Sequence, residues 1–161
     1  MNELTQLTDY YREQLEDGKM QQAYHALVNY VMKLKISMVN HYPEYKYGNV
    51  SQGYMDYTYF SVSDEYLRSK KLRFGIVFNH RLLSFELWLI GQNTAIQKEF
   101  WQKLRRSRWL TGNSQMPCYA VMELSLISAP DFSNTTRLTE EIMKMAAGNI
   151  CAITDFLKGI D

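Results

Sequence analysis

The chain has 161 residues, of which 46% are hydrophobic, so one domain can form a full core without disulfides or metals to support it. Eighteen basic and seventeen acidic residues leave a net charge of +1, so the whole molecule has no electrostatic signature for nucleic acid or an anionic membrane. Cys118 and Cys151 lie outside any Cys-x-x-Cys or Cys/His cluster, which argues against a structural zinc site.

Two amphipathic helices are predicted at the start of the chain. An apolar residue recurs every three or four positions over residues 3–16, and Gly18 suits the left-handed residue that ends such a helix. Similar spacing continues over residues 19–40, before Pro43 interrupts it. We expect these two helices to pack against each other as an N-terminal helical hairpin.

A strand and a short helix are predicted next. Residues 54–60 alternate between two faces, and we expect Met55, Tyr57 and Tyr59 to point toward the core. Residues 63–69 then form a short helix that is acidic at its start and basic at its end, as the helix dipole favours.

A β-hairpin forms the centre of the predicted fold. Residues 72–79 and 83–90 each have one wholly apolar face and one mixed face. Pairing Phe78 with Phe85 puts every large apolar side chain of the hairpin on the same side, and a slip by one residue would turn that set over. The same register places Trp88 opposite a glycine, so the indole can lie over a position without a side chain.

A helix and a last strand–helix unit complete the chain. Asn93 is a plausible N-cap for a helix that covers the apolar face of the hairpin through Ile96, Phe100 and Leu104. A strand over residues 119–127 and a helix over residues 136–158 follow. Since a strand–helix–strand connection most often returns parallel, we expect the last strand to make the sheet mixed.

These elements predict a single α+β domain spanning residues 1–161. Its sheet is expected to be four-stranded and mixed but mostly antiparallel, with the helices packed mainly on one face and the helical hairpin at the N-terminus.

Three carboxylates fall on the less apolar faces of three predicted strands. If these faces belong to one side of the sheet, the carboxylates would lie close together. Together with aromatic residues they would form a polar cluster on this face. The candidate ligand-binding residues of the cluster are Tyr54, Asp56, Arg73, Glu86, Trp88, Tyr119 and Glu123. Alternating polar residues also mark the wetter side of an ordinary antiparallel sheet, so the same pattern is compatible with no site.

The favoured function is a non-catalytic binding or regulatory domain, because aromatic residues are abundant and no catalytic, metal or cofactor motif is present. We therefore assign no catalytic residue, no metal ligand and no cofactor. The alternative is a divergent metal-dependent hydrolase that uses Asp56, Glu86 and Glu123. The element order resembles the restriction-endonuclease-like core in topology, which implies a Glu-x-Lys pair, but Trp88 stands in the lysine position after Glu86.

One basic cluster stands out near the end of the third long helix. It contains five cationic residues and two tryptophans, namely Lys98, Trp101, Lys103, Arg105, Arg106, Arg108 and Trp109. Tryptophans beside cations suit single-stranded nucleic acid, but basic residues also complement a helix C-terminus, and Glu99 is placed to pair with Lys103. We do not expect nucleic acid as a partner.

Several segments together resemble one family: YVMKLK, GNVSQGYMDYTYF, LRFGIVFNH, FELWLIGQN, IQKEFW and MPCYAVMEL. Over nearly its full length the chain resembles small bacterial proteins that carry a domain of unknown function. The resemblance implies a bacterial cytosolic protein and no particular activity. With no signal peptide and no ~18-residue apolar segment, we expect a cytoplasmic location, no membrane, and a small molecule, another protein or a second copy as the partner.

Overall fold

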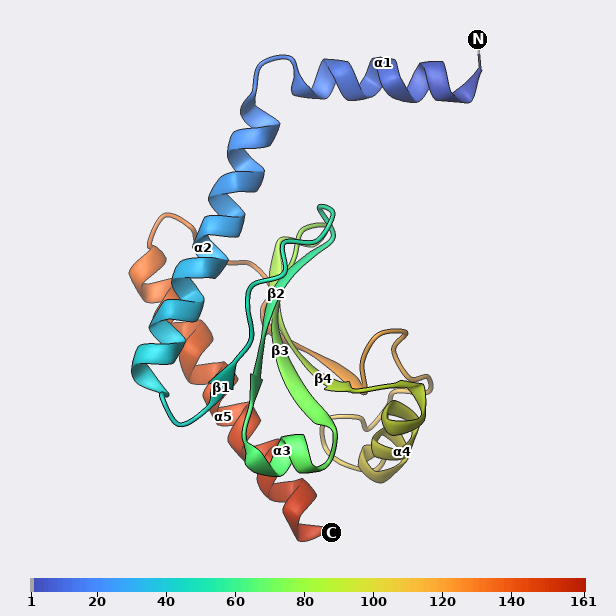
Figure 1. Cartoon of the computed structure of the whole chain (residues 1–161), viewed down its shortest axis with the longest axis vertical. Coiled ribbons are helices and arrows are strands. Elements are labelled where there is room, and N and C mark those ends of the chain that lie inside the picture. Colours follow the sequence, from blue (N-terminus) through green and yellow to red (C-terminus); the bar gives the residue numbers. More distant parts are fainter. Residues whose placement is uncertain (1) are drawn as a thin grey trace.

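The computed structural model describes residues 2–161 as an α+β fold with five helices and an open antiparallel sheet of five strands (Figure 1). The helices are α1 (Glu3–Leu15), α2 (Lys19–His41), α3 (Glu65–Ser69), α4 (Thr94–Leu104) and α5 (Thr135–Gly159). The strands are β1 (Lys46–Tyr47), β2 (Tyr57–Ser63), β3 (Leu72–Asn79), β4 (Ser84–Gly91) and β5 (Met122–Ile127).

The strands follow one another across the sheet in chain order, and every pair is antiparallel. The predicted four-stranded mixed sheet is therefore wrong in two respects. The two-residue β1 adds a fifth strand, and it is too short to produce an alternating pattern. β5 begins with Met122 beside Leu89, near the end of β4. The segment that contains α4 therefore leaves β4 and returns as β5 at the same end of the sheet, which makes the two strands antiparallel.

The predicted hairpin register is confirmed at every position. Phe78 pairs with Phe85, Ile76 with Leu87 and Gly75 with Trp88. The indole is not the group nearest to the glycine, however. The atoms nearest to a side chain at Gly75 come from Ile90, Val77 and Tyr59, and Trp88 leans along the strand instead.

Helices α2 and α5 lie together on one face of the sheet, as Figure 1 shows, and the main core lies between them and the strands. Phe74, Phe78 and Phe85 are at most 1% exposed in this core. Asn93 caps α4 as predicted, because its side chain accepts a hydrogen bond from the amide of Ile96 at 2.9 Å. Burial of Phe100 and Leu104 then joins α4 to the same core.

The prediction of which face of β2 points toward the core is wrong. Thr58, Phe60 and Val62 are the fully buried residues, whereas Tyr57 and Tyr59 lie on the opposite face. The prediction ended the strand at Phe60 and so missed the apolar Val62, which continues the core face. Thr58 fits there because its hydroxyl donates to the Gln52 carbonyl at 2.7 Å.

The prediction of an N-terminal helical hairpin is also wrong. Both helices form near the predicted residues, but α1 does not run back along α2 and instead projects away from the body (Figure 1). Gly18 forms the corner with φ of +74°, and the Lys19 amide donates to Asp17 Oδ1 at 3.0 Å. No residue of α1 is buried.

Candidate ligand-binding site

The helix-free face of the sheet carries a buried carboxylate, Glu86, which is 9% exposed. Its Oε2 accepts hydrogen bonds from Asn79 Nδ2 at 2.9 Å and Ser84 Oγ at 3.0 Å, and its Oε1 accepts from Trp88 Nε1 at 2.9 Å. All three donors are neutral. Both oxygens are therefore satisfied by the chain itself, which stabilises this face of β3 and β4.

Aromatic side chains surround this carboxylate, as the sequence predicted for Trp88. The rings of Tyr57 and Trp88 lie edge to face with centroids 4.9 Å apart. Burial together with the Glu123 and Glu86 carboxylates raises the pKa of Tyr57, and burial together with Glu86 raises the pKa of Glu123. Pairing of Trp88 with Glu123 across β4 and β5 places Glu123 on the same face of the sheet as Glu86. Tyr119 also contributes to the Tyr57 shift, although its side chain is 69% exposed.

Two predicted site residues lie elsewhere. Tyr54 is 95% exposed, and Asp56 sits in the turn before β2. The Asp56 carboxylate accepts from the amides of Tyr54 at 2.8 Å and Tyr57 at 2.7 Å, and these bonds lower its pKa. Asp56 therefore holds the turn and does not join Glu86 and Glu123. Within residues 2–161 no three His, Cys, Asp or Glu side chains gather closely enough to hold a metal ion.

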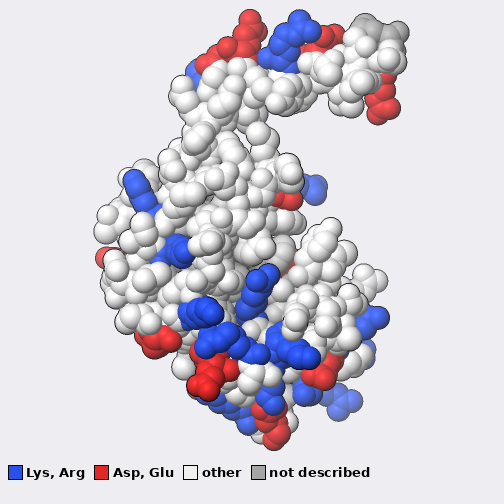
Figure 2. Space-filling view, in the orientation of Figure 1, with Lys and Arg blue, Asp and Glu red and all other residues white. Residues whose placement is uncertain are grey.

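Arg73, the remaining predicted residue, lies in a different place that the sequence did not indicate. It lines a pocket of about 500 Å³ between β1, α3 and the adjoining ends of β3 and β4. Four cationic side chains line this basic pocket: Lys46, Arg68, Lys71 and Arg73. Figure 2 shows Lys and Arg clustered over this part of the surface.

The cations of the basic pocket have no acidic partners. None of the four takes part in an ion pair within the described chain, and Arg68 makes a single 3.3 Å hydrogen bond to Ser63 Oγ. The other lining residues are neutral: Tyr47, Gly48, Ser61, Ser63, Leu72, Gly91 and Gln92. Like charges held together without compensation favour an anion, and guanidinium groups can bind phosphate or carboxylate oxygens in pairs.

Sequence reasoning missed this pocket because its cations come from separate elements. Lys46 lies in β1 and Arg68 in α3, whereas Lys71 directly precedes β3 and Arg73 lies at its start. No two of them belong to a motif with a known spacing. The alternation of β3 places Arg73 on the mixed face, which was the one available signal.

The basic cluster after α4 is arranged differently. Lys103 pairs with Glu99 at 3.7 Å, as predicted. The guanidinium carbons of Arg105 and Arg108 lie 5.2 and 4.7 Å from the ring centroids of Trp101 and Trp109. The arginines thus cover the tryptophans of their own chain, which leaves those rings less available to nucleic acid bases.

A family model described as a domain of unknown function (DUF7000) matches residues 4–157. No curated protein and no solved structure matches the chain. None of the helices described for residues 2–161 is both long and apolar enough to cross a membrane.

Proposed function

The chain belongs to the family described as a domain of unknown function (DUF7000), and we propose that it is a non-catalytic domain that binds a small anion in the basic pocket. The observation that carries this proposal is the convergence of Lys46, Arg68, Lys71 and Arg73 on one cavity without an acidic partner. A cavity of about 500 Å³ lies within the usual range for small-molecule sites.

The lining chemistry favours binding over catalysis. The pocket has no carboxylate or imidazole that could act as a general base on its serine hydroxyls. It does have the hydroxyl groups of Ser61 and Ser63 and the Gln92 amide, which can bind the uncharged part of an anionic ligand. A phosphate-bearing or polycarboxylate small molecule matches this set of donors.

Titration of the whole protein with inorganic phosphate and pyrophosphate tests the proposal. Calorimetry gives the affinity, and amide chemical shifts in heteronuclear NMR locate the site. We expect shifts centred on Arg68, Lys71 and Arg73, tighter binding of pyrophosphate than of phosphate, and weaker binding as salt is raised.

Arg73→Gln and Arg81→Gln form a matched pair for this test. Both arginines are exposed and lie at opposite ends of the same hairpin. Arg73→Gln removes charge-assisted hydrogen bonds, so we expect pyrophosphate affinity to fall roughly tenfold or more. Arg81→Gln should leave it unchanged. No binding by the wild-type protein, or equal losses in the two variants, would reject the proposal.

A further inference from the structure

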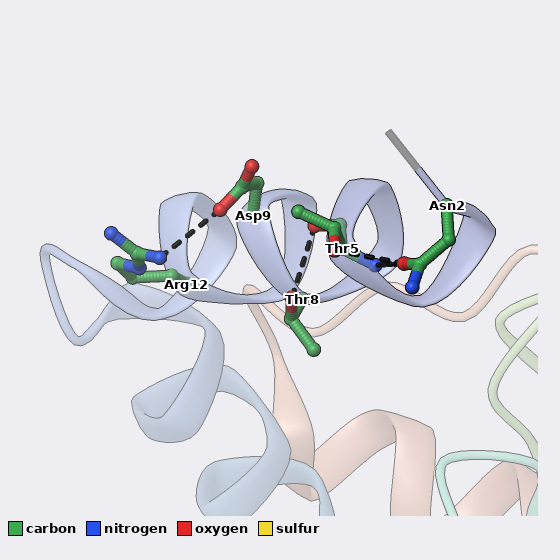
Figure 3. Close-up of polar contacts among 5 residues, drawn as sticks. All are labelled: Asn2, Thr5, Thr8, Asp9 and Arg12. Atoms are coloured by element: carbon green, nitrogen blue, oxygen red, sulfur yellow. Dashed lines mark hydrogen bonds and ion pairs between the residues drawn. The ribbon is translucent and has the colours of Figure 1, made fainter.

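Helix α1 exposes most of its apolar stripe. Leu4, Leu7, Tyr10 and Tyr11 are 68%, 58%, 62% and 65% exposed, and none of the 13 residues of α1 is buried. Side-chain hydrogen bonds drawn along α1 are local: the Asn2 cap on Thr5 and the Arg12 to Asp9 pair at 3.0 Å (Figure 3). Helices of this length are marginal in water without packing, so α1 lacks its packing partner.

A matching apolar groove runs along α2. It has a volume of about 1020 Å³ and lies between α2, the start of α5 and the β3–β4 turn. Its apolar lining residues are Ala23, Ala26, Leu27, Tyr30, Leu83, Phe132 and Met143. From Ala23 to His41 it follows α2 for about 27 Å, whereas α1 is about 20 Å long. One α1 helix therefore fits within the groove.

The N-terminal segment and α2 carry opposite net charges. The segment of residues 2–18 carries five acidic residues and one basic residue: Glu3, Asp9, Glu13, Glu16 and Asp17 against Arg12. Figure 2 shows these acids along the projecting arm. α2 carries Lys19, Lys33 and Lys35 and no acidic residue. Of these lysines, Lys33 lines the groove, which also contains the acidic Glu140. The opposite net charges of the N-terminal segment and α2 favour their association.

The corner at Gly18 keeps α1 away from the groove of its own chain. The Gly18 amide donates to the Leu15 carbonyl at 3.2 Å, and Gln21 Nε2 donates to the same carbonyl at 3.2 Å. With these bonds in place α1 extends outward from the end of α2 (Figure 1). In this orientation α1 does not fill the groove of its own chain.

We infer that two copies of the chain exchange their α1 helices, so that each α1 lies in the α2–α5 groove of the other copy. Each of the four exposed α1 side chains can lose on the order of 100 Å² of accessible surface. Including the groove side and both copies, the exchange buries on the order of 1,600 Å² in total, which is the size of a stable interface. The reciprocal arrangement is two-fold symmetric and closed.

Light scattering after size exclusion tests this inference on the full chain. The wild-type protein should have twice the 19.0 kDa mass of one chain. Leu7→Glu places a charge in the proposed contact from the helix side, and Ala26→Glu does so from the groove side. Both positions are exposed in the single chain, so both variants should keep the wild-type circular dichroism and unfold like wild type when monomeric.

Each variant should raise the dimer dissociation constant roughly 100-fold. Gln6→Glu adds the same charge on the polar side of α1 and should leave the dimer intact. Mixing Leu7→Glu with Ala26→Glu should restore a weaker dimer, because the mixed pair retains one unaltered helix in one unaltered groove. A monomeric wild-type chain would overturn the inference. So would a dimeric Ala26→Glu variant, which would indicate direct α1–α1 pairing, or a mixture that stays monomeric.

Discussion

Glu86 shows how a residue suggestive of chemistry in the sequence can serve the fold. Asn79 donates to Glu86 and, through its Oδ1, accepts from the amides of Arg81 at 3.1 Å and Leu82 at 3.2 Å. The carboxylate thus connects β4 to the turn that joins it to β3. Glu86 forms no ion pair within residues 2–161, so it depends on three neutral donors, and those donors depend on it.

Replacing Glu86 with alanine should therefore destabilise the protein strongly. The substitution leaves the buried donors of Asn79, Ser84 and Trp88 without their acceptor, at a cost of about 3 kcal/mol or more. Urea unfolding should show this loss, and the melting temperature should fall by roughly 6–12 °C. Glu123→Gln is the control on the same face. Since the folded state raises the pKa of Glu123, removing its charge should slightly stabilise the protein at pH 7 and have no such effect near pH 3.

His80 should make stability depend on pH. Burial lowers the pKa of His80, and this effect is larger than the increase that Asp56 causes. The Nε2 atom of His80 lies 2.7 Å from the Thr58 hydroxyl. The unfolded chain then binds this proton more readily, so the free energy of unfolding falls as pH drops through about 6.5. The difference in this free energy between wild type and His80→Gln should shrink from pH 7.5 to pH 5.5. A difference that grows instead would mean that Asp56 dominates. His25→Gln, on the exposed side of α2, controls for losing an imidazole.

At the scale of the elements, Gly91 and Gly148 predict opposite results for the same substitution. A Cβ at Gly91 would lie 2.9 Å from Gln97 Cγ and 3.0 Å from Ile96 Cγ2, so alanine must push the start of α4 away from β4. We expect Gly91→Ala to cost about 1–3 kcal/mol. Gly148 lies within α5 with open space around it, so Gly148→Ala should stabilise the protein by about 0.5–1 kcal/mol. Chemical denaturation of both variants measures the change in the free energy of unfolding for each. Changes of the same sign would contradict this account.

Elements with a long periodic pattern were predictable from the sequence, and short or irregular ones were not. The alternation through Leu72–Asn79 and Ser84–Gly91 determines the register, because any slip would expose a whole apolar face. β1 has two residues, too few for a period. The direction of β5 depends on how residues 105–121 return to Leu89, and no local pattern encodes that path.

The candidate site was predictable to a smaller degree. Alternation correctly put Glu86 and Trp88 on the face opposite the main core, and neighbouring strands bring Glu123 close to them. The alternation of residues along the strand could not show that other side chains of the protein would satisfy both oxygens of Glu86. The basic pocket depends on contacts between β1, α3 and β3, which only the folded chain brings together.

At the scale of the whole molecule, the two proposed binding regions share no lining residue. Figure 1 shows α1 and the first turns of α2 at one end, and β1 and α3, which border the basic pocket, toward the other. The main core between them contains residues from α2, the sheet, α4 and α5. A packed core is not continuously deformable, so coupling between the two regions would need a second stable arrangement of the core.

Anion binding and association through α1 should therefore be independent. Two sites are coupled only when binding at one changes the free energy of binding at the other, and the effect must then be equal in both directions. The pyrophosphate affinity of Leu7→Glu should match that of wild type within about twofold at every protein concentration. Calorimetry above and below the dimer dissociation constant measures this, with Arg73→Gln as the reciprocal control, whose association should equal that of wild type. A pyrophosphate affinity that rises with protein concentration would contradict independence and indicate that exchange of α1 reshapes the basic pocket.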